Sequence, residues 1–118
     1  MARVQVASVA AECLRAWTSG HAGSARILLH DDVTFDGPLG SVRGADDYVT
    51  GLERLSETVS GAEIRQVVAD GDEVCLIYDL VAGDPPVTIP TVGWYHMRDG
   101  KIAAIRAYFD PRPLLQRT

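Results

Sequence analysis

Long apolar runs are missing from this sequence of 118 residues. No stretch of about 18 or more uncharged apolar residues occurs, so the sequence predicts no membrane-spanning helix. The first residues carry one basic side chain, Arg3, and lead into a helical pattern that contains Glu12, which is not the pattern of a secretory signal peptide. We therefore expect a cytoplasmic protein that folds as one domain over residues 1–118, because this length supports one core and is too short for two.

Lysine is nearly absent, since Lys101 is the only one, and 11 Lys and Arg face 16 Asp and Glu for a net charge of −5. Nucleic-acid-binding proteins usually carry a basic stripe, so we exclude nucleic acid as a partner. Cysteine is also scarce: Cys13 and Cys75 lie far apart, and neither CxxC nor HExxH spacing occurs. We expect no metal, no cofactor and two free thiols in a reducing cytoplasm.

The hydrophobic pattern predicts three helices, with one short strand before the third, followed by four further strands. The first helix, over 4–19, has an apolar stripe at helical spacing formed by Val6, Ala10, Cys13 and Trp17. Further helices are predicted over 23–29 and 45–59, strands over 33–36, 62–69, 73–81, 87–97 and 102–110, and a loosely ordered tail over 111–118. Asp70-Gly71 and Asp99-Gly100 are hairpin signals, and Pro90 indicates a bulge or a sheet edge.

Helices that precede an antiparallel series of strands are typical of an α+β fold. The strand predicted over 73–81 has apolar residues on both of its faces. A sheet with one face in water would instead alternate apolar and polar residues. We therefore expect both sheet faces to be covered, one by the helices and the other by a second subunit.

Four stretches of the chain carry a resemblance to a known family: Ala16–Gly20, Asp32–Gly40, Asp99–Ile102 and Ala107–Asp110. In their order and spacing the chain resembles the SnoaL-like, or nuclear transport factor 2-like, superfamily. That superfamily includes steroid delta-isomerases, SnoaL-type polyketide cyclases and limonene epoxide hydrolases. The resemblance implies a cone in which a curved antiparallel sheet packs on about three N-terminal helices around a mostly apolar pocket, and it implies a homodimer through the convex sheet face.

The resemblance also implies which residues line the pocket and bind a hydrophobic small molecule. They are Cys13, Trp17, Phe35, Tyr48, Leu52, Leu76, Leu80, Met97, Ile105, Ala107 and Phe109, together with Gly37, Tyr78, Gly93 and Tyr95.

The catalytic residues of these families are missing at the matching positions. The general-base aspartate, the oxyanion-hole tyrosine and the protonated aspartate of steroid isomerases fall on Gly37, Cys13 and Gly93. The histidine and aspartate of the cyclases fall on Gly93 and Ala107, and the base aspartate of the epoxide hydrolases also falls on Ala107. These reactions need carboxylates with tuned pKa values inside an apolar cavity, so none of the three mechanisms carries over.

Tyr78, Tyr95 and His96 are the candidate catalytic residues. A buried tyrosine hydroxyl either bonds to backbone or water, or donates to a ligand carbonyl. A two-residue turn at Asp99-Gly100 would place His96 in the pocket, where protonation near neutral pH suits acid/base chemistry. A three-residue turn would place Tyr95 there and His96 outside. The resemblance puts Gly93 on the pocket face and so favours the three-residue turn.

Two functions remain open. One is a small-molecule enzyme of the polyketide cyclase or isomerase type, or a hydrolase, that acts on a hydrophobic substrate in the apolar pocket. The alternative is a non-catalytic ligand-binding or structural dimeric domain, which the empty acid/base positions favour. On the favoured register the convex face carries Trp94, His96, Arg106 and Tyr108. Exposed aromatics beside an arginine are typical of an interface, so we expect a two-fold homodimer.

Overall fold

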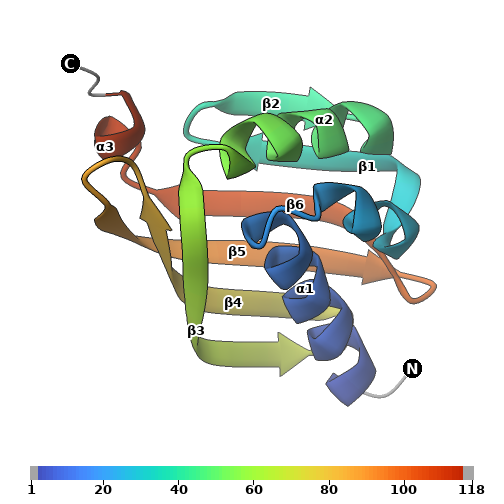
Figure 1. Cartoon of the computed structure of the whole chain (residues 1–118). Helices are drawn as coiled ribbons and strands as arrows, with labels where there is room; N and C mark the ends of the chain where they lie inside the picture. The colour runs from blue at the N-terminus through green and yellow to red at the C-terminus, as the bar shows by residue number, and fades with distance from the viewer. Residues whose placement is uncertain (1–2, 116–118) are drawn as a thin grey trace.

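The computed structural model describes residues 3–115, with side chains from residue 6 onward. The elements in chain order are α1 (Arg3–Thr18), the 3-10 helix η1 (Ala22–Leu28), β1 (Leu29–Gly37), β2 (Gly40–Arg43), α2 (Ala45–Ser56), β3 (Val59–Asp70), β4 (Glu73–Ala82), β5 (Val87–Arg98), β6 (Lys101–Phe109) and α3 (Arg112–Leu115). Figure 1 shows α1, η1 and α2 gathered on one face of a single sheet and α3 at one end of it, which confirms the predicted α+β class. Within the described residues, no helix has the length and apolar character needed to cross a membrane.

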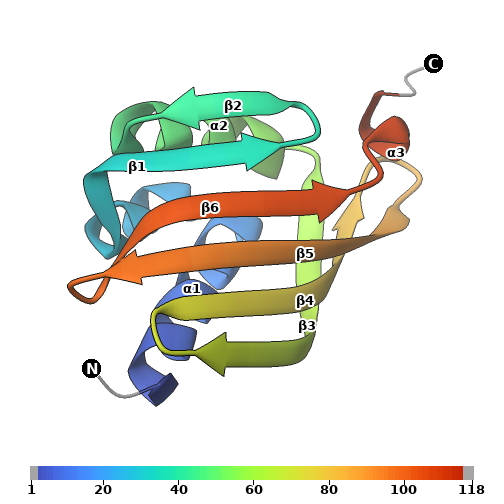
Figure 2. The same ribbon diagram turned by 180° about the vertical axis from the view of Figure 1, so that it is seen from behind.

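The six strands lie in the order β2-β1-β6-β5-β4-β3, which Figure 2 shows from behind. Neighbouring strands are antiparallel except β1 and β6, which run parallel. The register of β3 shifts between Val59 and Gly61 and again between Ile64 and Gln66. Bulges of this kind bend a strand, and Figure 1 shows the first half of β3 turned away from the direction of its second half. The bend curves the sheet around the helices.

Side chains alternate between two faces of the central strands. The inner face, which packs on α1 and α2, carries the buried residues Val74, Leu76, Tyr78 and Leu80 of β4 and Ile89, Thr91, Gly93, Tyr95 and Met97 of β5. The opposite face, called the outer face below, leaves Ile77, Trp94 and Tyr108 exposed. The period-2 alternation of β4 therefore assigns the faces as the sequence predicts.

In the hairpin between β5 and β6, the side chains have the expected orientation, but the turn differs from the expected one. Asp99 and Gly100 have φ values of 52° and 81°, which makes a two-residue turn of the primed type. The strands pair in the register Arg98↔Lys101, Met97↔Ile102, His96↔Ala104 and Tyr95↔Ile105. Ala103 is thus the extra residue of a β-bulge, which shifts the register by one. Tyr95 is inside and His96 outside as expected, whereas the expected three-residue turn is wrong.

Pro90 sits where the sheet tolerates a residue without an N–H. It pairs with Asp79 of β4 in regular register, while β6 ends at Phe109 opposite Thr91. Its other side therefore faces no strand, and the predicted sheet edge is confirmed locally.

Two expectations about the ends of elements are wrong. Gly40–Arg43, which the hydrophobic pattern does not mark as a strand, forms β2 because it pairs with the end of β1 across the Gly37–Gly40 turn. The expected loose tail contains the one-turn helix α3 within its described part. The Asp110 carboxylate accepts a hydrogen bond of 3.0 Å from the backbone N–H of Arg112, and Leu114 packs against the core.

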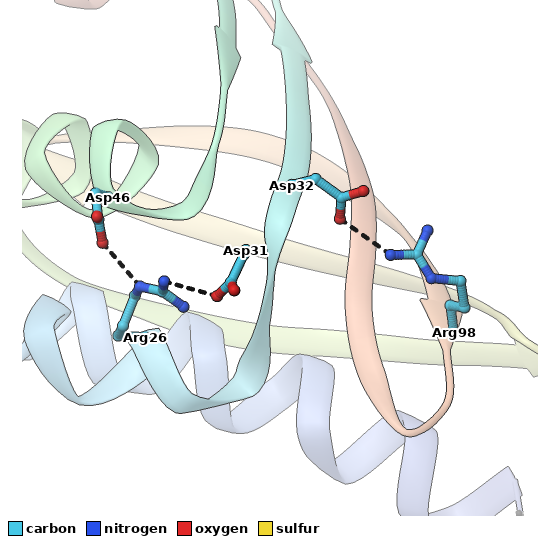
Figure 3. A network of polar contacts seen from close by, with 5 residues as sticks. All are labelled: Arg26, Asp31, Asp32, Asp46 and Arg98. Carbon is cyan, nitrogen blue, oxygen red and sulfur yellow. Dashed lines mark hydrogen bonds and ion pairs between the residues drawn. The ribbon is translucent and has the colours of Figure 1, made fainter.

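Charged pairs orient η1 beneath the sheet (Figure 3). Arg26 donates from Nη2 to Asp31 at 2.8 Å and from Nε to Asp46 at 2.9 Å, so it joins η1 to the start of β1 and to the first turn of α2. Arg98 of β5 lies 3.0 Å from Asp32 of β1. Because these groups are largely exposed, water screens the pairs, and they orient the segments more than they stabilise them.

Candidate functional site

A small cavity lies between the inner face of the sheet and the helices. Its volume is about 50 Å³. We call it the inner cavity, and its lining consists of Trp17, Phe35, Tyr48, Leu52, Leu55, Tyr78, Leu80, Thr91, Gly93, Tyr95, Ile105, Ala107, Phe109 and Leu114. No carboxylate, imidazole or ammonium group belongs to this lining. The cavity is therefore apolar apart from a few hydroxyl and N–H groups.

Three tyrosine hydroxyls open onto the inner cavity. Tyr48 comes from α2, Tyr78 from β4 and Tyr95 from β5, and their side chains are 6%, 6% and 3% exposed. None of these hydroxyls has a hydrogen-bond partner among the described residues, whereas the Thr91 hydroxyl donates to the carbonyl of Ile89 at 3.0 Å. Since no fully enclosed polar side-chain atom of the described residues lacks a partner, each tyrosine hydroxyl retains some accessible surface, and all three tyrosines line the cavity. Buried tyrosines usually find a partner, so these three are available to a ligand.

Burial keeps these groups protonated at neutral pH. It raises the pKa of Tyr48, Tyr78 and Tyr95 well above the usual value, and the proximity of the groups to one another raises the pKa values further. Burial, reinforced by Glu12, also raises the pKa of the Cys13 thiol to about 12. A thiol in this state is a poor nucleophile and a phenol in this state is a poor base. The groups can therefore donate hydrogen bonds, and they do not accept a substrate proton at neutral pH.

The rings of two cavity-lining residues fill the space beside Gly93, which lines the cavity, and Gly37, which does not. A Cβ atom at Gly93 would lie 2.9 Å from Cε1 of Tyr95 and 3.3 Å from its hydroxyl oxygen. A Cβ atom at Gly37 would lie 2.9 Å from Cζ of Phe35. Phe35 in turn packs against Tyr48 with ring centroids 5.4 Å apart. These are two of the positions at which the resemblance places catalytic carboxylates, so both the side chains and the room for them are missing here.

Most of the residues expected to bind a ligand lie at the inner cavity. Those in its lining are Trp17, Phe35, Tyr48, Leu52, Leu80, Ile105, Ala107 and Phe109, along with Tyr78 and Tyr95. Cys13, Leu76 and Met97 are almost fully buried but belong to the core outside the lining. The expected lining position is therefore wrong for these three residues and also for Gly37, which lies outside the lining.

Three residues of the lining were not expected there from the sequence. Thr91 shares the inward parity of Gly93 and Tyr95, so the alternation of β5 contained the signal for it. Leu55 belongs to the apolar stripe of α2. Leu114 lies in the tail, where no pattern indicates a contact with the core.

His96 takes part in a polar cluster on the outer face. Its Nδ1 bonds to one carboxylate oxygen of Glu73, and the other oxygen accepts a hydrogen bond of 2.7 Å from Nε1 of Trp94. The Arg106 guanidinium lies 5.8 Å from the centroid of the Trp94 ring. Burial raises the pKa of Glu73, but the hydrogen bonds from His96 and Trp94 outweigh it and hold the pKa below its usual value. His96 is thus separated from the inner cavity by the sheet.

A second hollow adjoins the inner cavity at the end of the molecule where α3 lies. This outer groove has a volume of about 620 Å³. Its lining consists of Leu39, Leu55, Glu57, Thr58, Val59, Ser60, Gly83, Asp84, Pro113 and Leu114. Figures 1 and 2 both place α3 beside the loop between β4 and β5.

Nowhere in residues 3–115 do three or more histidine, cysteine or acidic side chains gather as a metal site would require.

The chain is similar in sequence and fold to known proteins. Residues 10–105 match the SnoaL-like domain family. An NTF2-like protein of unknown function from Cytophaga hutchinsonii is 30% identical with a TM-score of 0.83, over 94% of this chain and 95% of that one. No curated protein sequence matches the chain.

Two more distant solved structures share the fold. An LEH-like epoxide hydrolase from M. tuberculosis is 23% identical, with a TM-score of 0.81 over 96% of this chain and 88% of that chain. A protein with a ketosteroid isomerase-like fold from Catenulispora acidiphila, in complex with trimethylamine, is 16% identical, with a TM-score of 0.78 over 86% and 85%. Proteins of this shape therefore include an epoxide hydrolase and a protein that holds a small organic molecule.

Proposed function

Because the chain belongs to the SnoaL-like domain family, we propose that its inner cavity binds a small, largely apolar organic molecule through a hydrogen-bond acceptor such as a carbonyl oxygen. The observation that carries this proposal is the set of three buried tyrosine hydroxyls without a protein partner, all facing one apolar cavity. Pockets that are apolar with a few well-placed polar groups are typical of small-molecule sites. The trimethylamine held by a relative of this fold supports the same use of the fold here.

The lining of this cavity is compatible with one mechanism for a cyclase or isomerase reaction. A proton would leave the carbon next to the ligand carbonyl, and the electron pair would move onto the carbonyl oxygen. The protonated hydroxyls of Tyr78 and Tyr95 would then stabilise the resulting oxyanion. Water or a basic group of the substrate accepts the proton, because the lining contains no carboxylate or imidazole. Catalysis would thus rest on hydrogen-bond donation alone.

The double variant Tyr78→Phe/Tyr95→Phe tests the role of the hydroxyls. With acetophenone as the probe, we expect binding to weaken by about tenfold or more, because each lost hydrogen bond contributes roughly 1 kcal/mol and the ligand carbonyl would stay unpaired in a dry cavity. Titration calorimetry on the purified protein measures the change in Kd. The matched control is Tyr108→Phe, which removes an exposed hydroxyl from the outer face. Equal affinities of wild type and double variant would refute the proposal.

We also propose that a second copy of the chain covers the outer face. Exposed apolar side chains gather there: Ile77 is 38% exposed, Trp94 39% and Tyr108 50%. The register places Ile77 opposite Val92, and Val92 opposite Tyr108, so these residues form one row across the sheet. A contiguous apolar row with an arginine stacked on a tryptophan has the composition of an interface.

Sedimentation equilibrium of the variant Ile77→Asp tests this dimer. We expect the monomer–dimer Kd to rise by at least about thirtyfold, because an apolar side chain at the centre of an interface contributes roughly 2 kcal/mol or more. The matched control is Ile27→Asp, since Ile27 is 75% exposed on η1, on the helical side of the sheet. A monomeric wild type, or an Ile77→Asp variant that dimerises as before, would exclude this interface.

A further inference from the structure

We infer that the inner cavity and the outer groove form one binding site, whose ligand places an acceptor tip among the tyrosines and a cationic body in the groove. The inference rests on the proposed function and extends it to the class of ligand. It is drawn from the shared wall of the two hollows, their unequal sizes and the charges of the groove.

Leu55 and Leu114 line both hollows. Leu55 comes from α2 and Leu114 from α3, so two elements far apart in the sequence make the wall between cavity and groove. Both side chains are only partly buried against the core. The position of Leu114 depends on α3, which begins where Asp110 binds the Arg112 side chain at 2.6 Å as well as its backbone N–H. In the inferred site, a shift of one of these leucines would open the inner cavity to the outer groove.

The sizes of the hollows divide the ligand into two parts. An engineered dry cavity of about 150 Å³ binds a benzene molecule, and a single water needs roughly 10–15 Å³ of probe-occupied volume. The inner cavity, at about 50 Å³, has room for a group of a few heavy atoms such as an acetyl group. The outer groove, at about 620 Å³, has room for the remainder of a drug-sized molecule. The tyrosine hydroxyls in the small chamber then meet the tip of the ligand.

The charges of the outer groove indicate the chemical nature of the ligand body that would lie in it. Glu57 and Asp84 are the charged residues in its lining, and neither belongs to an ion pair among the described side chains. The nearby Arg112 offers no competing positive charge to a ligand, since its Nε and Nη2 atoms are held by Asp110 at 2.9 and 2.6 Å. Exposed acidic residues alone would not mark a site. Here they adjoin a cavity lined by three buried tyrosines whose hydroxyls have no partner among the described residues. The two carboxylates of the groove therefore favour a cationic body over an anionic one.

Three para-substituted acetophenones test the charge preference. They share the acetyl tip and carry a trimethylammonio group, a tert-butyl group of the same shape, or a carboxylate. In the variant Glu57→Gln/Asp84→Asn, we expect the Kd of the cation to rise by roughly fivefold, the Kd of the carboxylate to fall and that of the tert-butyl probe to stay within twofold, because exposed charges contribute at most about 1 kcal/mol. Added salt should reduce the same differences. Unchanged ratios among the three probes would overturn the inferred charge preference.

The association rate of the neutral tert-butyl probe tests whether the leucine wall controls passage from the outer groove into the inner cavity. In Leu114→Ala we expect the association rate, followed by tryptophan fluorescence, to rise severalfold because the path into the inner cavity is wider. The control Leu115→Ala, in the same helical turn, alters a residue that is 63% exposed and lines neither hollow. Equal rates in Leu114→Ala and wild type would overturn the inferred continuity.

The two proposals fail in different ways. If the wild-type protein binds the tert-butyl probe and Tyr78→Phe/Tyr95→Phe does not, the tyrosine site is supported, independently of the results for the groove variants. If the Kd ratios are unchanged in Glu57→Gln/Asp84→Asn and the association rate is unchanged in Leu114→Ala, only the inference of a joint site for a two-part ligand is wrong. If the wild-type protein binds none of the three probes, both proposals are wrong.

Discussion

Raising the pH above about 10 is expected to unfold this protein within a narrow range, and the three buried tyrosines should ionise together as it unfolds. Tyr48, Tyr78, Tyr95 and Cys13 all have native pKa values above those of exposed groups. Exposed cysteine and tyrosine titrate near pH 8.5 and about 10 in an unfolded chain. The stability they contribute is therefore complete below those values, and it is lost as the pH rises toward the native pKa values, where the unfolded chain has fewer bound protons.

The size of this effect follows from the number of groups. Each group that is ionised only in the unfolded chain lowers the free energy of unfolding by about 1.4 kcal/mol per pH unit. Four such groups lower it by roughly 5 kcal/mol per unit, against a total of about 5–15 kcal/mol for an ordinary domain. Unfolding is then expected within about one to three units above pH 10.

Phenolate absorbance and far-ultraviolet circular dichroism, followed in the same titration, measure this transition. The absorbance should contain one steep step of about three phenolates that coincides with the loss of the dichroism signal. In Tyr78→Phe the step should shrink by about a third, and the transition should be less steep. Gradual ionisation of three tyrosines in a protein that keeps its native dichroism would mean that the hydroxyls reach bulk water.

Gly93→Asp is expected to be the most damaging single substitution at the cavity. The new Cβ atom would lie 2.9 Å from the Tyr95 ring and displace it, and a carboxylate would enter an apolar space that contains no cation in its lining. Gly93→Asn introduces nearly the same shape without the charge. Full burial can raise a carboxyl pKa by as much as about three to five units, and with a shift of about three units we expect the Asp variant to be less stable than the Asn variant by roughly 4 kcal/mol at neutral pH.

The pH dependence separates the charge from the shape. The native pKa of the introduced carboxyl is raised, so its destabilising effect disappears below the unfolded pKa of about 3.9 and grows as the pH rises toward the native pKa. Urea unfolding of both variants at neutral and acidic pH measures the difference. Equal stabilities of Asp and Asn variants at neutral pH would show that the carboxylate finds water, and that the site has room for the side chain the glycine lacks.

The sequence predicted the faces of the central strands well because their side chains alternate with a strict period of two. Val74, Leu76, Tyr78 and Leu80 all face inward as the apolar pattern predicts. The same pattern failed where contacts between distant segments decide the outcome. It did not mark β2, whose only reason for being a strand is its pairing with β1.

The candidate site shows the same division. Apolar periodicity and the family resemblance together indicated most of the lining. They could not show that Cys13, Leu76 and Met97 stop short of the cavity, since that depends on where α1 and η1 cross the sheet. They also gave no reason to place Leu114 at the cavity, because α3 is held by Asp110 and by contact with the core.

The residue types of this chain therefore determined its α+β class and the inward set of β4, because side-chain period is a local property, and the family resemblance indicated a cavity without acid or base. Tertiary structure decided the rest. The bulge at Ala103 turns Tyr95 inward and His96 outward after a two-residue turn that alone would have done the reverse. The rings of Phe35 and Tyr95 close the space beside two glycines, and Leu114 reaches the cavity wall from the end of the chain. These outcomes depend on register and on packing between distant segments, which no single stretch of sequence specifies.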